Sequence, residues 1–166
     1  FESKKVSTLN LNNINIKTTN IKKLIKAGDL GTLKKFLGRN YGVLAEVEPG
    51  DARGRRLGYP TANLKKENVV ILPSGIYLAH VFLRGIRKNG LVYIGDRPSF
   101  EMSSRKVILE AHILDHRGDL YGKKILVEFL KKIRDDRKFP DEKSLSCQIE
   151  KDVEKARAYF EKESSR

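Results

Sequence analysis

The segment Gly54–Leu64 combines residue types that suit a site for phosphate and metal. It contains two glycines and two arginines, followed by Pro60, Thr61 and Asn63. Glycine lets backbone N–H groups turn toward an anion without a Cβ in the way, and arginine adds fixed positive charge. The segment lacks the Gly-Lys-Ser/Thr ending of a Walker A loop, and no G-x-G-x-x-G opens a helix. Glycine spacing alone therefore favours a hairpin turn, with an anion-binding loop as the alternative.

Pro60 makes the second half of this segment more informative. A proline fixes its own φ and favours an extended conformation for the residue before it, here Tyr59. In an extended chain Thr61 and Asn63 point to the same side. Mg²⁺ prefers hard oxygen ligands and keeps several waters, so a hydroxyl and a carboxamide beside nucleotide phosphates are compatible with a magnesium site, although these residues alone favour a turn. In a turn, both side chains would only satisfy the backbone.

Glu110 is the candidate general base. It lies in the apolar run Val107–Leu114, where a carboxylate either faces water or has a chemical task. A base that accepts the proton of a substrate hydroxyl accelerates a reaction by about 10²–10⁴-fold. His112 shares the face of Glu110, but a lone strand histidine is more often a structural hydrogen-bonding group, and we interpret it so. The single Cys147 cannot complete a zinc cluster.

Two periodicities predict the elements that position these residues. Apolar alternation predicts a strand that begins at Tyr41 and ends at a turn at Pro49. It predicts further strands at 76–83, 91–94, 106–114 and 122–132, with residues 84–90 as a hairpin loop. A short edge strand is expected within 9–16. Short polar connections favour an antiparallel barrel over β-α-β units. Helical spacing predicts an amphipathic helix through 145–160 and a helical hairpin over 18–37, with Thr18 or Thr19 and then Asp29 as N-caps.

Composition limits the classes of function. The chain has 166 residues, enough for one ordinary domain plus some extra structure, and a formal net charge of +13. That charge attracts polyanions, so a basic β-barrel that binds nucleic acid is one alternative, although no aromatic residues are interleaved with the basic ones. No apolar run reaches the length of a membrane span, and the first residues have no signal-peptide core. With one cysteine, a cytoplasmic protein is expected.

From about Leu37 to Phe160 the chain resembles riboflavin kinases and the kinase module of bifunctional prokaryotic FAD synthetases. The resemblance rests on motifs that occur in order: 37–41, 54–64, 72–77, 94–100, 109–114, 119–122, 133–139 and 148–152. It implies a mainly β fold, a six-stranded antiparallel Greek-key barrel with a C-terminal helix and a short N-terminal helical segment. It also implies transfer of the ATP γ-phosphoryl group to the 5′-hydroxyl of riboflavin, giving FMN, with Mg²⁺.

The same resemblance assigns roles to individual residues. Glu110 would deprotonate the ribityl 5′-hydroxyl, while Thr61 and Asn63 would hold Mg²⁺. The ATP phosphates would lie against Gly50 and Arg55, with Thr61 also counted as an ATP contact. The adenine pocket would be lined by Ile113, Asp115 and Tyr121, and riboflavin would be covered by Arg134, Arg137 and Phe139.

The N-terminal part resembles a different module. Residues 1–38, and Ile16–Lys22 in particular, resemble the end of the adenylyltransferase module of bifunctional enzymes, and residues 39–163 form the expected kinase domain. No HxGH motif occurs, so FMN adenylylation is not expected of this chain, and a longer parent chain could carry that module. Tyr93 stands where the family usually has Asn, and Ser99 where it has Thr. A kinase-like partner module without activity is a further alternative. Riboflavin and ATP are the expected partners, without nucleic acid or membrane.

Overall fold

The computed structural model describes residues 10–11, 14–51, 53–65, 70–97 and 106–165 of the chain. The barrel strands are β3 (Tyr41–Glu48), β4 (Ala62–Lys65), β5 (Gly75–Leu83), β6 (Ile86–Arg97), β7 (Lys106–Ile113) and β8 (Lys124–Arg134). They close in the order β3-β4-β7-β6-β5-β8, and every pairing is antiparallel. The order β8-β5-β6-β7 within it is that of a Greek key. The predicted six-stranded antiparallel barrel is confirmed.

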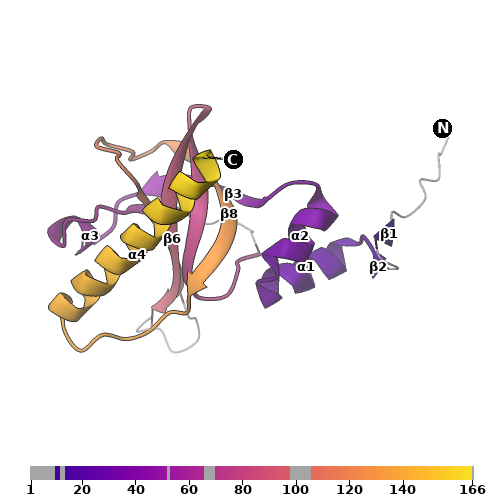
Figure 1. Cartoon of the computed structure of the whole chain (residues 1–166), viewed down its shortest axis with the longest axis horizontal. Helices are drawn as coiled ribbons and strands as arrows, with labels where there is room; N and C mark the ends of the chain where they lie inside the picture. Colours follow the sequence, from indigo (N-terminus) through magenta and orange to yellow (C-terminus); the bar gives the residue numbers. More distant parts are fainter. Residues whose placement is uncertain (1–9, 12–13, 52, 66–69, 98–105, 166) are drawn as a thin grey trace.

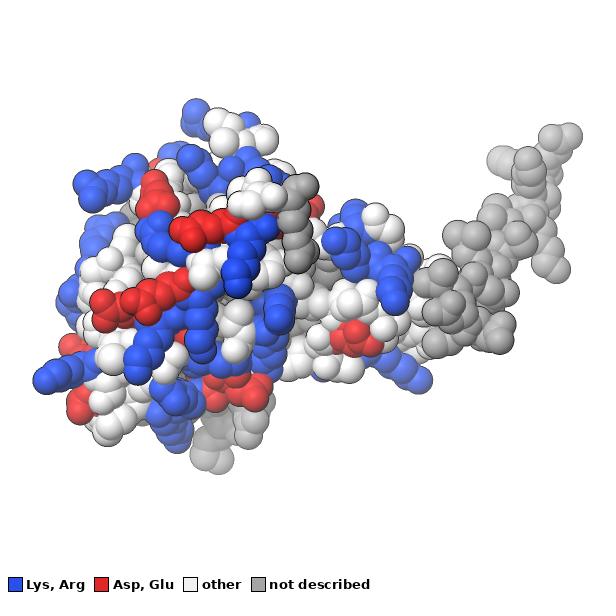
Figure 2. Space-filling view, in the orientation of Figure 1, with Lys and Arg blue, Asp and Glu red and all other residues white. Residues whose placement is uncertain are grey.

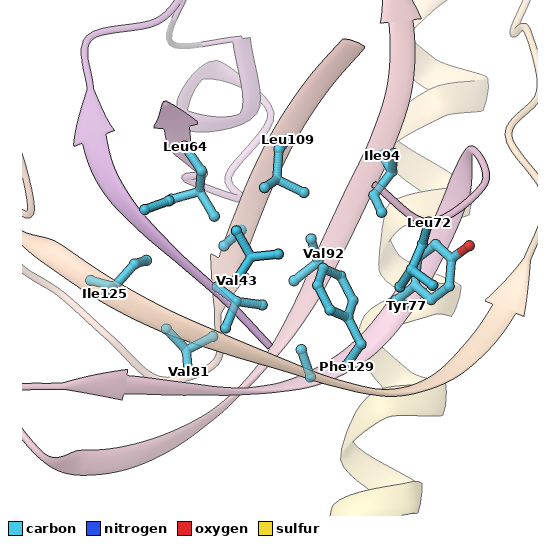
Figure 3. Packing of buried hydrophobic residues seen from close by; sticks show 14 of the residues in the cluster. Val43, Leu64, Leu72, Tyr77, Val81, Val92, Ile94, Leu109, Ile125 and Phe129 are labelled. Carbon is cyan, nitrogen blue, oxygen red and sulfur yellow. The ribbon is translucent and has the colours of Figure 1, made fainter. Parts of the chain in front are cut away.

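The barrel interior is filled by the inward-facing half of each strand. On β3, Val43, Ala45 and Val47 are buried while Leu44 and Glu46 are exposed, which is the alternation that the sequence predicts. Figure 3 shows the resulting core, with the rings of Tyr77 and Phe129 among aliphatic side chains. These two rings meet edge to face, with centroids 5.6 Å apart. Burial of this kind fixes which face of each strand remains available for a site.

The buried Tyr77 hydroxyl keeps its proton. It donates a hydrogen bond of 2.6 Å to the backbone oxygen of Pro73. Burial, with a smaller effect from the negative charge of Asp135, raises the pKa of Tyr77 to about 12. The hydroxyl is therefore a fixed structural donor that ties the start of β5 to the segment before it.

The β5–β6 hairpin is tighter than the sequence suggests. The predicted loop over 84–90 is wrong, because β6 begins at Ile86 and only Arg84 and Gly85 form the turn. Both turn residues have positive φ, 50° and 82°, as a two-residue hairpin turn requires. The polar residues Arg87 and Lys88 are paired with β5 because ladder hydrogen bonds use backbone groups, which polar side chains do not disturb. Strand β8 also lies two residues later than predicted.

A helical hairpin precedes the barrel, as expected. It consists of α1 (Thr18–Ala27) and α2 (Leu30–Leu37), each followed by a glycine in the left-handed region. Asp29 caps α2 by accepting a hydrogen bond from Thr32 N at 3.0 Å. Neither threonine caps α1: Lys17 occupies the cap position, without a side-chain bond. The expected edge strand is instead a small pair, β1 (Asn10–Leu11) and β2 (Ile14–Asn15), that joins no barrel strand, and Leu9 lies outside the described residues.

The C-terminal helix α4 (Glu142–Ser164) lies across the outside of the barrel (Figure 1). Its residues Ala156 and Phe160 pack against apolar side chains of β5 and β6. Asp141 caps its N-terminus by accepting from Ser144 N at 2.7 Å. The predicted helix is confirmed, and its position brings one of its faces beside the sheet. Among the described residues, no helix is long and apolar enough to cross a membrane.

Candidate active site

A cavity of about 500 Å³ lies between one face of the barrel, helix α4 and the segment that follows β8. Strands β4, β7, β6 and β5 supply its floor, and the N-terminal half of α4 supplies one side. The short helix α3 (Arg53–Arg56) lies at another edge. The predicted site residues that line this cavity are Thr61, Asn63, Glu110, Arg134, Arg137 and Phe139.

Five of the lining residues form one row across five neighbouring strands. Asn63 is opposite Glu110, Glu110 is opposite Tyr93, Tyr93 is opposite Ile76, and Ile76 is opposite Arg134. Neighbouring strands lie about 4.8 Å apart, so the row extends about 19 Å along the curved sheet. The pairing therefore sets an order, with Asn63 and Glu110 at one end, Arg134 at the other and Tyr93 in the middle.

The carboxylate and the hydroxyl meet at the first end of this row. The Thr61 hydroxyl donates a hydrogen bond of 2.9 Å to Glu110 Oε2. His112 lines the same wall and lies 2.8 Å from the backbone oxygen of Pro60 through its Nδ1. Because a carbonyl oxygen only accepts, Nδ1 carries the proton. His112 thus makes the structural hydrogen bond that its strand position suggests, and it holds the chain just before Thr61.

The glycines beside Thr61 allow close approach. A Cβ on Gly50 would overlap the Asn63 carboxamide, and one on Gly54 would overlap the backbone oxygen of Tyr59. Both glycines therefore let other groups of this loop lie directly against the backbone. Gly50 does not line the cavity, but it sets the place of Asn63, which does.

Arg53 is an arginine of α3 that lines the cavity, and the phosphate contact of Arg55 stays a prediction. Arg53 and Gly54 of α3 are in the cavity wall, whereas Arg55 is exposed and does not line it. The reason is local: residues 53–56 form a single helical turn, so neighbouring side chains point in different directions. Arg53 also lies 3.6 Å from Glu142 at the start of α4.

The far end of the row holds the two arginines and the phenylalanine of the predicted riboflavin site. The guanidinium carbons of Arg134 and Arg137 lie 5.9 and 4.9 Å from the centroid of the Phe139 ring. A guanidinium over an aromatic face is a favourable cation–π arrangement. The hydroxyl of Tyr93 donates to Asp136 Oδ2 at 3.1 Å, which ties the middle of the row to the segment after β8.

The residues assigned to adenine do not line this cavity. Ile113 is buried in the barrel core, and Tyr121 is 46% exposed. Asp115 accepts two hydrogen bonds from Arg157 of α4, at 2.7 and 3.0 Å. These hydrogen bonds, together with the positive charge of Arg157, hold the pKa of Asp115 below its ordinary value of 3.8. An adenine site at these residues remains a prediction.

The chemistry of the donors fits Mg²⁺ bound together with phosphate. Thr61, Asn63 and Glu110 offer hydroxyl, carboxamide and carboxylate oxygens, all hard ligands. No group of three or more His, Cys, Asp or Glu residues that could hold a metal occurs among the described residues. These residues therefore suit an ion that takes its remaining ligands from nucleotide oxygens and water. The face of the molecule drawn in Figure 2 is not uniformly basic, because acidic side chains are interspersed with basic ones.

Sequence reasoning did not assign roles to Tyr93, Asp136 and Asp152, which line the cavity, or to Gln148, which does not line it but donates a hydrogen bond to Asp152. The last two lie one helical turn apart on α4, within a motif of the resemblance. Asp152 is 2% exposed. The sequence did contain a signal for Asp152, because this acidic residue is close to Ile149, Val153 and Ala156 on the apolar face of a predicted helix. Within the motif at 94–100, residues 98–100, which include Ser99, lie outside the described residues.

The fold and the cavity define a class: a closed six-stranded barrel with a C-terminal helix, and with acidic, hydroxyl and arginine side chains around one cavity. A family model described as "Flavokinase: Riboflavin kinase" matches residues 37–160. The chain therefore belongs to the riboflavin kinase family, as its motifs predict.

Curated proteins similar to this chain include riboflavin kinase in their names. The chain is 34% identical over 161 residues to a bifunctional riboflavin kinase/FMN adenylyltransferase of Buchnera aphidicola. This match covers 96% of the chain and 51% of the relative. It is 37% identical over 146 residues to the protein of the same name from Haemophilus influenzae, covering 87% of the chain and 47% of the relative. The chain thus spans about half the length of the curated relatives it matches.

A solved structure has the same fold. It is described as a macrolide-efflux protein from Streptococcus pneumoniae and superposes with a TM-score of 0.82 at 29% identity. The match covers 92% of this chain and 50% of that one. The likeness supports the barrel-and-helix architecture.

Proposed function

We propose that this chain transfers the γ-phosphoryl group of ATP to the 5′-hydroxyl of riboflavin, giving FMN and ADP. The observation that carries the proposal is the row from Asn63 to Arg134. Its first end offers oxygen ligands and a carboxylate, and its other end offers arginines over an aromatic ring. Riboflavin has a matching layout, because a ribityl chain separates its terminal hydroxyl from a planar three-ring system.

Glu110 is the proposed base. In the absence of substrate, its Oε2 accepts the hydrogen bond of the Thr61 hydroxyl. With riboflavin bound, the carboxylate would accept the proton of the 5′-hydroxyl as that oxygen forms its bond to the γ-phosphorus. The bond between the γ-phosphorus and the β,γ-bridging oxygen breaks, and ADP leaves with its electron pair. The base prepares the nucleophile, while most of the rate comes from positioning and charge neutralisation.

Thr61 and Asn63 are the proposed protein ligands of Mg²⁺, which neutralises phosphate charge when it is bound. Gly50 supports this site indirectly, because it leaves room for the Asn63 carboxamide. We assign phosphate contacts to the backbone near Gly50 and to Arg55 as predicted, with Arg53 as the arginine closer to the cavity. Adenine contacts at Ile113, Asp115 and Tyr121 complete the proposed ATP site.

The arginine end is the proposed flavin site. Arg134 and Arg137 lie over Phe139, so donors and a flat apolar face occur together there. A flavin ring offers carbonyl oxygens along one edge and flat faces above and below, and these groups pair with donors and aromatic surfaces.

The curated relatives carry a second named activity, FMN adenylyltransferase, and the chain spans about half their length. We infer that this chain supplies the kinase step alone and that residues 1–38 are the end of an adenylyltransferase module. We expect FMN rather than FAD as its product, and a cytoplasmic location where ATP and riboflavin are both present.

The test is product analysis. The chain is incubated with riboflavin, ATP and Mg²⁺, and the flavins and adenine nucleotides are separated by chromatography. FMN and ADP formed in equal amounts, with no FAD, support the proposal. A folded chain that forms no FMN but binds DNA or RNA, with an affinity that falls steeply with salt, would favour the nucleic-acid alternative. A folded chain with neither property would favour a partner module.

A further inference from the structure

Asp152 of helix α4 is a buried carboxylate in the cavity wall that the proposed chemistry does not use. It is 2% exposed. Its Oδ2 accepts a hydrogen bond from Nε of Arg134 at 2.8 Å, and Nη2 of the same guanidinium lies 2.8 Å from this oxygen in an ion pair. Its Oδ1 accepts from Nε2 of Gln148 at 2.8 Å. Burying a carboxylate is costly unless such partners satisfy it, so this residue needs both of its neighbours.

The bonds to Asp152 fix the guanidinium of Arg134. Nη1 of Arg134 also donates to the backbone oxygen of Asp135 at 3.0 Å. A guanidinium has five N–H groups, and Nε and Nη1 each use one in these hydrogen bonds, while Nη2 is ion-paired with Asp152, so N–H groups remain for a ligand. All three nitrogens are held at once, which prevents the planar group from rotating. Its carbon lies over the Phe139 ring, 5.9 Å from the ring centroid.

The same helix fixes the second arginine. Gln148 lies one turn before Asp152, on the same side of α4. With its Nε2 directed to Asp152, its Oε1 is free to accept a hydrogen bond, and it accepts one from Nη2 of Arg137. A continuous series of hydrogen bonds therefore runs from Arg134 through Asp152 and Gln148 to Arg137.

We propose that Asp152 is a positioning residue: from helix α4 it fixes Arg134 directly, and Arg137 through Gln148, in the geometry that binds the flavin ring of the acceptor. This inference rests on the proposed function. It adds an explanation of what holds the guanidinium groups of Arg134 and Arg137 in place. It gives α4 a task beyond covering the barrel. A site whose donors are already held loses less freedom when its ligand binds.

The competing interpretation is that Asp152 only attaches α4 to the barrel. Besides the contact of Glu142 with Arg53 at the cavity edge, α4 has polar attachments away from the cavity: Arg157 with Asp115, and Glu163, whose Oε2 lies 3.5 Å from Nε2 of His80. A loss of attachment at Glu163 should therefore resemble the loss at Asp152 if attachment is all that matters.

Asp152→Asn is the main variant, because it keeps the size of the side chain and removes its charge. Glu163→Gln makes the same kind of change at an attachment outside the cavity and serves as the matched control. Riboflavin and ATP binding are measured by flavin fluorescence quenching and calorimetry, turnover by FMN formation, and folding by thermal melting. For Asp152→Asn we expect the riboflavin Kd to rise about 10- to 100-fold, because a charge-assisted hydrogen bond is lost. The ATP Kd and kcat at saturating riboflavin should stay within about threefold of wild type.

Gln148→Ala tests the same series of bonds without removing the buried charge. We expect its riboflavin Kd to rise about 3- to 10-fold, the effect of one hydrogen bond, with a melting temperature near that of wild type. If Asp152→Asn fails to fold, Gln148→Ala decides alone. Unchanged riboflavin affinity in a folded variant, or equal losses for ATP and riboflavin that Glu163→Gln reproduces, would overturn the inference.

The failure of this inference is distinguishable from failure of the proposed function. Wild-type chain that forms FMN while Asp152→Asn binds riboflavin normally would refute the positioning role alone. Wild-type chain that binds riboflavin but forms no FMN would refute the kinase proposal, and the binding series would still test Asp152. Wild-type chain that does not bind riboflavin would refute both.

Discussion

Replacing Glu110 by glutamine separates two roles that the structure allows for this carboxylate. Gln keeps the shape of the side chain, and its amide oxygen can still accept the hydrogen bond that Thr61 donates at 2.9 Å. It cannot accept a proton. If Glu110 only oriented Thr61, the loss would be that of one hydrogen bond, about 0.5–1.5 kcal/mol, or roughly 2- to 13-fold in rate.

Loss of a general base is larger. It lowers turnover by about 10²–10⁴-fold, which corresponds to about 2.7–5.4 kcal/mol in the activation barrier. The two ranges do not overlap, so kcat alone decides between them. The assay is FMN formation at saturating riboflavin, ATP and Mg²⁺, with riboflavin affinity measured separately. We expect Glu110→Gln to keep riboflavin and ATP binding and to lose at least about 10²-fold in kcat.

Glu46→Gln is the matched control, because Glu46 is a strand glutamate whose side chain is exposed on the outer face of β3. It should turn over like the wild type. A Glu110→Gln variant with kcat within about tenfold of wild type would refute the base assignment. Equal losses in both variants would mean that the barrel, rather than the site, had been damaged.

Three further predictions concern the metal site, its support and the attachment of α4. Thr61→Ala should raise the Mg²⁺ concentration for half-maximal rate, and an unchanged Mg²⁺ titration would exclude Thr61 as a ligand. Gly50→Ala should displace the Asn63 carboxamide and have the same effect on the titration without lowering riboflavin affinity, whereas a wild-type titration would show that the loop adapts. Because the pKa of Asp115 is lowered, its pairing with Arg157 stabilises the fold fully above the ordinary pKa of 3.8. This contribution is lost as pH falls through the lowered pKa. The melting temperature of Asp115→Asn should therefore be below that of wild type at pH 7 and approach it below about pH 4; a difference independent of pH would contradict this.

Many of the strands and helices, and the end of the site with Thr61, Asn63 and Glu110, could be predicted because they depend on local sequence patterns. Alternation identified β3, and Pro60 indicated that Thr61 and Asn63 face the same way; both line the cavity. Glu110 stood out as a carboxylate in an apolar strand. Its distance from Thr61 was not predictable from local pattern, because it depends on the pairing of β4 with β7, which are far apart in sequence.

The opposite end depends on tertiary packing. The period of α4 indicates an apolar stripe, but it does not indicate which barrel strands the stripe covers. The partnership of Asp152 with Arg134 follows only from that placement. The position of Arg53, rather than Arg55, in the cavity wall follows from one turn of helix in a run whose glycine spacing favoured a hairpin turn. The shorter hairpin at Arg84 shows that polar side chains do not exclude pairing.

The central claim is that the acceptor extends along the row, with its hydroxyl at Glu110 and its ring near Arg134. Proton relaxation of bound riboflavin, with ADP and with Mn²⁺ in place of Mg²⁺, measures this directly, because a paramagnetic ion accelerates the relaxation of nearby protons most. The account predicts strong relaxation of the protons on ribityl C5′ and weak relaxation of the ring methyl groups. Equal relaxation of both, or stronger relaxation of the methyl groups, would contradict it.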